Sequence, residues 1–179
     1  NLGNVAMESG DLGAAAEVYE QATAAFREIG SRWGMAGTLG NLAQLSLSLV
    51  RPQQARDQLL ENLRLCAEVG NPTAETSCQS RLAMAQLELG DAAGALESAR
   101  AARQVAHAIG NRHYEAQAQI AMGDAHAALQ RWDDAREQSV RAAETFAAVH
   151  MGFGQMRGDA RRAAAGPHPG DHPAGVGRG

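Results

Sequence analysis

Lysine is absent from the sequence, and aromatic residues, proline and cysteine are scarce. All 16 basic residues among the 179 are arginine, aromatic residues make up 4%, and there are 5 prolines and 2 cysteines. With so few aromatic residues the core has to be built from aliphatic side chains. Alanine and leucine, both strong helix formers, supply them. Patterns typical of β-strands are also missing, so the sequence predicts an all-α protein.

Two further absences bear on possible partners. No apolar run approaches the ~20 residues of a membrane helix, which makes the cytoplasm the expected compartment and a membrane partner unexpected. The net charge of −4 divides into −6 over residues 1–150 (12 Arg against 18 Asp and Glu) and +2 over 151–179 (4 Arg against 2 Asp). A nucleic-acid binder is expected to show a basic face, so the acidic body argues against direct contact of the repeats with DNA or RNA.

Spacings that nucleotide or metal chemistry requires are missing as well. The sequence contains no GxxxxGKS/T loop, no HExxH and no paired CxxC, and no nucleophile stands beside a base. We therefore expect no enzyme activity, no cofactor and no metal site. Cys66 and Cys78 are expected to be small buried core residues, since free cysteine usually behaves as a small hydrophobic side chain.

What the sequence does contain is an internal repeat with a period of forty residues. Copies begin at Asn1, Asn41, Arg81 and Ala121, and such a period is typical of helical solenoids. Large and small residues keep fixed places in the repeat, as close helix packing requires. Three columns show this: Leu2, Leu42, Leu82 and Met122; Gly3, Ala43, Ala83 and Gly123; Ala15, Ala55, Ala95 and Ala135.

Turn signals divide each repeat into a helical hairpin. Gly10-Asp11 pairs a residue suited to a left-handed C-cap with a carboxylate N-cap, and Asn71-Pro72 pairs a cap with a first-turn proline. We expect four repeats over residues 1–150, the first truncated at its N-terminus. A helix over 151–165 would then cap the open end of the array. The alternative is that the arginines of this helix form a basic patch for an acidic partner. The Pro- and Gly-rich segment 166–179 is expected to be disordered.

The repeat resembles the tetratricopeptide repeat. That pattern has a Leu-Gly or Leu-Ala pair, a turn seven residues later, an alanine five residues after the turn glycine, and an aromatic or apolar residue four further on. The first copy matches it at Leu2, Gly3, Gly10, Ala15 and Tyr19, whereas Val50 and Gln130 replace the turn glycine. The forty-residue form is similar to repeats of actinobacterial transcriptional regulators and signalling ATPases, and of Pins-type scaffolds. The resemblance implies a right-handed superhelical solenoid.

The same resemblance places the ligand surface on the inner wall, formed by the first helix of each repeat. This wall mixes amide, acidic and apolar groups and contains no Lys or Arg, so we expect a protein or peptide guest with apolar anchors and some basic character. The candidate positions are Asn4, Met7, Glu8, Gln44, Leu47, Ser48, Met84, Leu87, Glu88 and Asp124, with Gly40, Ser80 and Ile120 preceding them.

Two functions stay open at this point. One is a protein- or peptide-binding scaffold, the sensor or interaction region of a larger bacterial regulatory protein. The other is a structural spacer or self-association module that joins its neighbours through exposed repeat ends and holds nothing in its groove. A nucleotide switch upstream would favour the first function, and continued repeats would favour the second.

Overall fold

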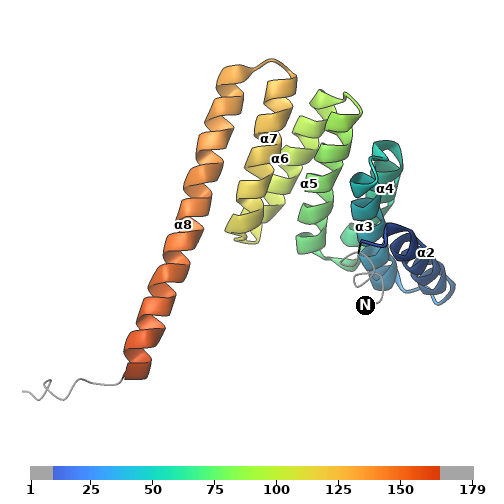
Figure 1. Cartoon of the computed structure of the whole chain (residues 1–179), viewed down its shortest axis with the longest axis horizontal. Coiled ribbons are helices and arrows are strands. Elements are labelled where there is room, and N and C mark those ends of the chain that lie inside the picture. The colour runs from blue at the N-terminus through green and yellow to red at the C-terminus, as the bar shows by residue number, and fades with distance from the viewer. Residues whose placement is uncertain (1–9, 166–179) are drawn as a thin grey trace, which may run out of the picture.

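The computed structural model describes the backbone of residues 10–165 and the side chains as far as Val149 (Figure 1). The helices of this part are α2 (Leu12–Glu28), α3 (Arg32–Ser48), α4 (Pro52–Val69), α5 (Pro72–Glu88), α6 (Ala92–Ala108), α7 (Arg112–Ala128) and α8 (Trp132–Ala165). Each begins twenty residues after the previous one, and no strand interrupts them within 10–165. The prediction of an all-α chain of helical hairpins is confirmed.

Side-chain caps and prolines fix the helix starts. The carboxylate of Asp11 accepts a hydrogen bond from Ala14 N at 3.0 Å, and Asp91 caps α6 in the same way. Asn71 caps α5, whose first residue is Pro72, as predicted. Each such cap contributes ~1 kcal/mol to helix stability. These residues therefore determine where the helices of each hairpin begin, and packing of the helices supplies most of their stability.

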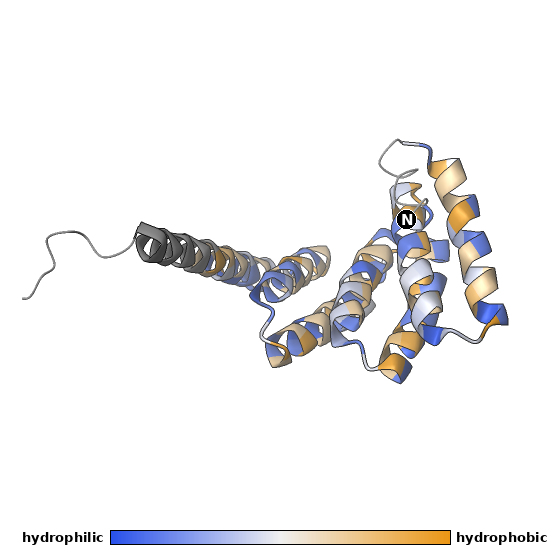
Figure 2. Cartoon of the chain, turned by 90° about the horizontal axis from the view of Figure 1, so that it is seen from below, coloured by the Kyte–Doolittle hydropathy of each residue, from blue (hydrophilic) through white to orange (hydrophobic). Residues whose placement is uncertain are grey.

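The helices are arranged in two rows. Each helix packs against the next one in the chain, and α3 and α7 both contact α5. Within the described residues, α2, α4, α6 and α8 make no such contacts with one another. The array therefore has a crowded inner row, α3–α5–α7, and an outer row whose helices spread apart. Figure 2 shows the resulting row of helices from below, and the predicted solenoid architecture is confirmed.

The core is made of the large and small residues that recur in register. Leu42, Leu82 and Met122, equivalent positions of three repeats, are at most 6% exposed. Ala43 and Ala83 beside them are completely buried. A large side chain on one helix can fit against a neighbour only where that neighbour carries a small one. The large and small residues that recur at fixed places in the sequence therefore pack against one another in the core of the array.

Both cysteines are free thiols buried between α4 and α5, as predicted. The amide of Asn62, itself 2% exposed, lies between them. Its Nδ2 donates to Sγ of Cys78 at 3.0 Å, and its Oδ1 accepts from Sγ of Cys66 at 3.6 Å. Asn62 occupies the position that alanine holds in the other repeats, so this polar cluster is particular to the second repeat.

The C-terminal end of the array differs from the prediction. The sequence predicted a helix end near Val149 and a separate capping helix over 151–165, whereas α8 runs without a break for 34 residues and extends beyond the body of the array (Figure 1). The earlier turns between one repeat and the next have a glycine followed by Ser or Asn, but His150 and Met151 occupy those places here. The boundary near Val149 was therefore wrong, because the turn residues are missing. The truncated first helix and the tail over 166–179 lie outside the described residues.

Candidate functional site

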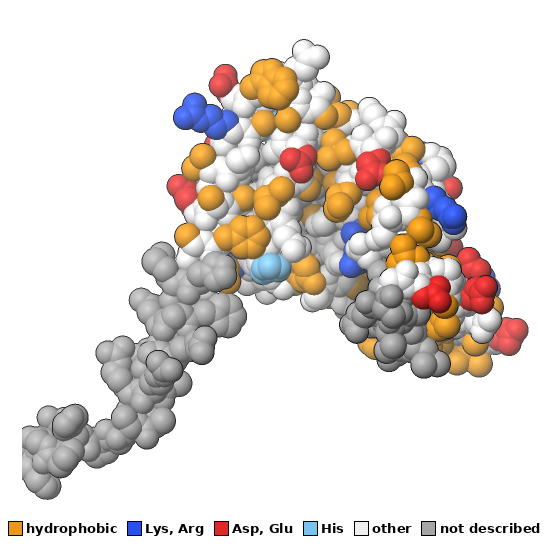
Figure 3. All heavy atoms as spheres, in the orientation of Figure 1, with side chains coloured by type: hydrophobic (Ala, Val, Ile, Leu, Met, Phe, Trp, Pro, Cys, Tyr) orange, Lys and Arg blue, Asp and Glu red, His pale blue; other side chains and the backbone are white. Residues whose placement is uncertain are grey.

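A groove with a volume of about 570 Å³ lies on the inner row of helices. In the space-filling view of Figure 3, apolar side chains line much of this face and a cationic group lies near its middle. The volume falls within the usual range for ligand pockets, ~300–1,000 Å³. The residues that line this inner groove are Gln44 of α3, Ser77, Ser80, Arg81 and Met84 of α5, and His113, Tyr114, Gln117, Ile120, Ala121 and Asp124 of α7.

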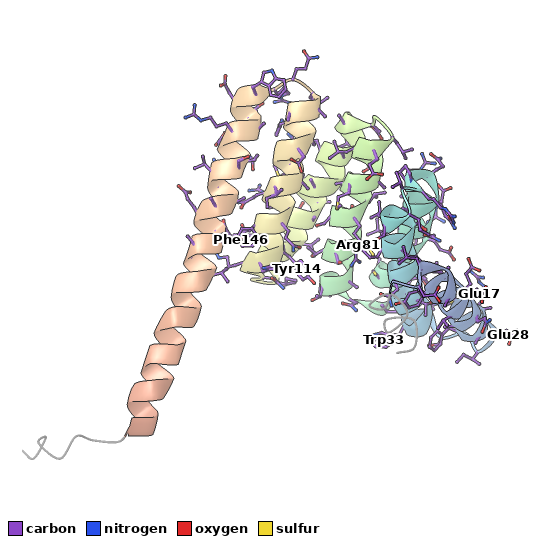
Figure 4. All side chains as sticks on the ribbon, viewed as in Figure 1. Glu17, Glu28, Trp33, Arg81, Tyr114 and Phe146 are labelled. Carbon is purple, nitrogen blue, oxygen red and sulfur yellow. The ribbon has the colours of Figure 1, made fainter. Side chains whose placement is uncertain are left out.

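Arg81 connects two hollows of this face. Its Nε donates a hydrogen bond to Oε1 of Gln44 at 2.8 Å, which links α5 to α3. A smaller cavity of about 270 Å³ on the α3 side shares Ser77, Arg81 and Tyr114 with the inner groove. Figure 4 shows Arg81 and Tyr114 on the neighbouring helices α5 and α7. Among the described residues Arg81 has no carboxylate partner, so its guanidinium can receive an acidic group.

Asp124 supplies the opposite charge in the same groove. It forms no ion pair with any residue that the structure describes, and burial raises the pKa of its carboxyl group. A partly desolvated carboxylate favours a cationic partner. The apolar side chains of Met84 and Ile120 also face this groove and are 51% and 45% exposed. The groove thus offers a cation, a carboxylate and apolar surface.

Three of the predicted positions meet in the inner groove. Gln44, Met84 and Asp124 are equivalent residues of successive repeats, and each lies on a different helix of the inner row. Ser80 and Ile120, which precede the last two by four residues, join them. The repeat therefore does bring one column of the sequence to one face. That these residues bind a partner stays a prediction.

The positions predicted one turn further along the helices lie elsewhere. Leu47 is only 8% exposed and packs among alanines of α4 and α5. Leu87 is half-buried against a core cluster that includes Leu96 and Met122. Ser48 and Glu88 are exposed but do not line the groove. Leu47 and Leu87 were therefore wrong as groove residues. The predicted residues of the first repeat, Asn4, Met7 and Glu8, lie outside the described residues.

The groove extends instead toward the N-terminal halves of α5 and α7. It uses Ser77, Arg81 and Tyr114, which precede the predicted positions by three to ten residues. Helical side chains tilt toward the N-terminus, so a residue covers the turn before its own Cα. The expectation that the wall contains no Lys or Arg was wrong, because Arg81 lies three residues before Met84. A search on both sides of each predicted position would have found it.

The described residues contain no group of three or more His, Cys, Asp and Glu placed to hold a metal ion. None of the helices described is long and apolar enough to cross a membrane. Gly34 of α3 lies against the ring of Phe26 on α2, so a Cβ added at this position would clash with the ring. This glycine allows close packing of α2 on α3.

The seven helices that the structure describes stand in two rows and form a helical-repeat solenoid with a tetratricopeptide-like fold, with a groove on the inner row. No protein-family model and no curated protein sequence matches the chain. Solved structures do, and they show the same fold. A BtubC (BKLC) structure from P. vanneervenii superposes with a TM-score of 0.74 at 20% identity, over 97% of this chain and 66% of that one.

Two further structures carry the repeat in their descriptions. A STAND (signal transduction ATPase with numerous domains) protein with a tetratricopeptide repeat sensor from Pyrococcus horikoshii matches with a TM-score of 0.73 at 18% identity, over 81% of this chain and 23% of that one. A Podospora anserina kinesin light chain structure with nearly identical TPR-like repeats matches with a TM-score of 0.51 at 15% identity, over 84% and 93%. The chain thus spans only part of the longer proteins.

Proposed function

We propose that this chain is a protein-binding scaffold that holds a segment of a partner protein in the inner groove, as the sensor or interaction region of a larger bacterial regulatory protein. The observation that carries this proposal is the presence of Arg81, Asp124, Met84 and Ile120 in one groove. The charged pair has no ion-pair partner among the described residues, and the apolar pair is about half exposed.

The chemistry of the groove defines its guest. An acidic side chain or a terminal carboxylate fits Arg81, whose planar guanidinium can form paired hydrogen bonds with a carboxylate. A basic group fits Asp124, and apolar side chains fit Met84 and Ile120. A guest with apolar anchors and both charges therefore matches better than the guest with apolar anchors and some basic character that the sequence predicted. The sensor role is supported by the likeness to the STAND protein, whose repeats are described as a sensor.

The test selects peptides from a random display library and compares three forms of the chain. The groove variant carries Gln44→Arg, Met84→Arg and Asp124→Arg. The matched control carries Gln54→Arg, Leu60→Arg and Glu97→Arg. As in the groove variant, arginine replaces one glutamine, one apolar residue and one acidic residue, but at exposed positions of α4 and α6. We expect the original chain and the control to enrich the same peptides, which combine apolar residues with both charges, and the groove variant to lose them.

Circular dichroism should show equal helicity for all three forms, because every substituted side chain has access to solvent. The proposal fails if the original chain enriches no peptide or if both variants lose binding equally. The alternative, a spacer or self-association module, would then gain support. Trp132 and Val140 of α8, 65% and 51% exposed, give that alternative an apolar surface at the end of the array.

A further inference from the structure

A second cavity, of about 420 Å³, lies on α6 in the outer row and shares no lining residue with the inner groove. Its lining consists of Arg100, Arg103, Gln104 and His107 of α6 and Met122 of α7. We term it the basic pocket. No acidic residue belongs to this lining, although the whole chain has a net charge of −4. Positive charge is therefore concentrated at this place.

The basic side chains share one helix face. Arg100, Arg103, Gln104 and His107 stand at i, i+3, i+4 and i+7, the spacing that brings helical side chains together. Neither Arg100 nor Arg103 has an ion-pair partner among the described residues, whereas six other arginines do. The two guanidinium groups therefore repel each other without a compensating carboxylate.

A buried donor in the pocket also lacks an acceptor. The Nε of Arg103 is inaccessible and forms no hydrogen bond with the described residues. Such unsatisfied buried groups are rare in folded proteins and call for an explanation. Glu115, which contacts His107 of the same lining, does not neutralise Arg103, because its oxygens lie 3.2 Å from Nδ1 of His107 and 3.3 Å from Nη1 of Arg112. Because the Arg103 side chain as a whole is half-buried, an oxyanion from outside can reach its guanidinium from the solvent side, although not at the buried Nε.

We propose that the basic pocket binds a phosphate monoester. Phosphate monoesters carry about −1.5 to −2 charges at pH 7 and three acceptor oxygens, which matches the two unpaired arginines. Guanidinium groups bind such oxygens in pairs. Gln104 offers a further donor, and the buried Met122 supplies the apolar part of the lining. The volume of the cavity leaves room for a group attached to the phosphate.

The test measures binding of inorganic phosphate, of a phosphoserine peptide and of the same peptide without phosphate by titration calorimetry at low salt. The pocket variant carries Arg100→Gln and Arg103→Gln. The matched control carries Arg64→Gln and Arg136→Gln, which remove the same charge from two exposed arginines that also lack an ion-pair partner in the described part of the chain. We expect the pocket variant to lose at least about tenfold in affinity for the phosphopeptide and the control to lose less than about twofold.

The probes distinguish the sources of the phosphate group. Equal affinity for inorganic phosphate and phosphopeptide would mean that the phosphate alone is recognised, and tighter binding of the phosphopeptide would identify a protein-borne ester. The proposal is overturned if the original chain binds neither probe, if it binds the unphosphorylated peptide equally well, or if both double variants lose the same affinity. Should the double variant misfold, Arg100→Gln alone, at an exposed position, carries the same test.

Discussion

Arg81 and Gln44 are 37 residues apart in sequence, and the Nε of the arginine donates to Oε1 of the glutamine at 2.8 Å. The bond joins α5 to α3, equivalent helices of successive repeats whose direct packing is sparse. A charge-assisted bond of this kind contributes more than a neutral one. It also orients the guanidinium in the inner groove. The geometry of the groove on its α3 side therefore depends on a side-chain pair.

A double-mutant cycle with Gln44→Ala and Arg81→Ala tests this relationship. Hydrogen bonds to charged groups contribute about 1.5–3 kcal/mol when buried, and both side chains are only partly buried, so we expect a coupling energy of about 1 kcal/mol. Urea unfolding of the two single variants and the double variant measures it. Additive effects within about 0.3 kcal/mol would show that the bond contributes nothing to stability.

Gly40 and Asn62 should be energetically coupled. A Cβ added to Gly40 would lie 3.1 Å from Nδ2 of Asn62, which is tighter than most real contacts. Replacement of a helical glycine by alanine normally stabilises by about 1 kcal/mol. We expect Gly40→Ala to give little of this gain alone and most of it in the Asn62→Ala background. Thermal and urea unfolding of the four forms measure the difference.

If Gly40→Ala raised the free energy of unfolding equally in both backgrounds, the two residues would not be coupled. Asn62→Ala by itself should destabilise by about 1–3 kcal/mol, because it leaves a cavity and removes the contacts of the amide with both thiols. Gly37→Ala serves as the control, since nothing lies within 4 Å of a Cβ at that position of the same helix.

Val50 is the most strained residue of the turns. It adopts φ 54°, where the equivalent positions of the first and third repeats have glycine, and its side chain is 77% exposed. A β-branched residue in the left-handed region costs about 1–2 kcal/mol, and little burial compensates for it here. We expect Val50→Gly to stabilise the chain by about 1 kcal/mol in urea unfolding. Gly90→Val should destabilise by a similar amount, and an unchanged midpoint in both variants would contradict the assignment.

Because His126 is buried, we expect the folded chain to lose stability when the pH is lowered. Burial and, second, the charge of Arg131 lower the pKa of His126; Arg100 on α6 also lowers it, and Asp134 and Glu137 on α8 oppose the shift. Because the unfolded histidine takes up a proton near pH 6.5 while the folded one does not, the free energy of unfolding should fall as the pH drops below about 6.5. Above that pH both states are neutral and the effect vanishes.

The measurement is urea unfolding between pH 7.5 and pH 5 for the original chain and for His126→Gln. The variant should lose the part of the pH dependence that this residue contributes. An identical pH profile in the two forms would show that other groups cause the loss. His107→Gln is the control, since that ring is largely exposed and the change should leave the component due to His126 in place.

The sequence by itself determined the elements and their packing rule. Helix starts at Asp11, Asn71 and Asp91 were predictable because a cap is a local hydrogen bond within one turn of chain. The buried columns were predictable because a forty-residue period places equivalent residues on equivalent faces. Even the unbroken α8 could have been predicted from His150, which stands where the other repeats have glycine.

Only the tertiary structure decided which side chains share a site. Arg81 stands three residues before the predicted position Met84, but nothing in the sequence shows that its side chain lines the inner groove. It enters the inner groove because α3, α5 and α7 crowd together on one side and because helical side chains tilt toward the N-terminus. The basic pocket likewise depends on Met122 of α7 lying beneath α6. Such sites are made by residues from different helices, and their geometry follows from the curvature of the array, which no single repeat encodes.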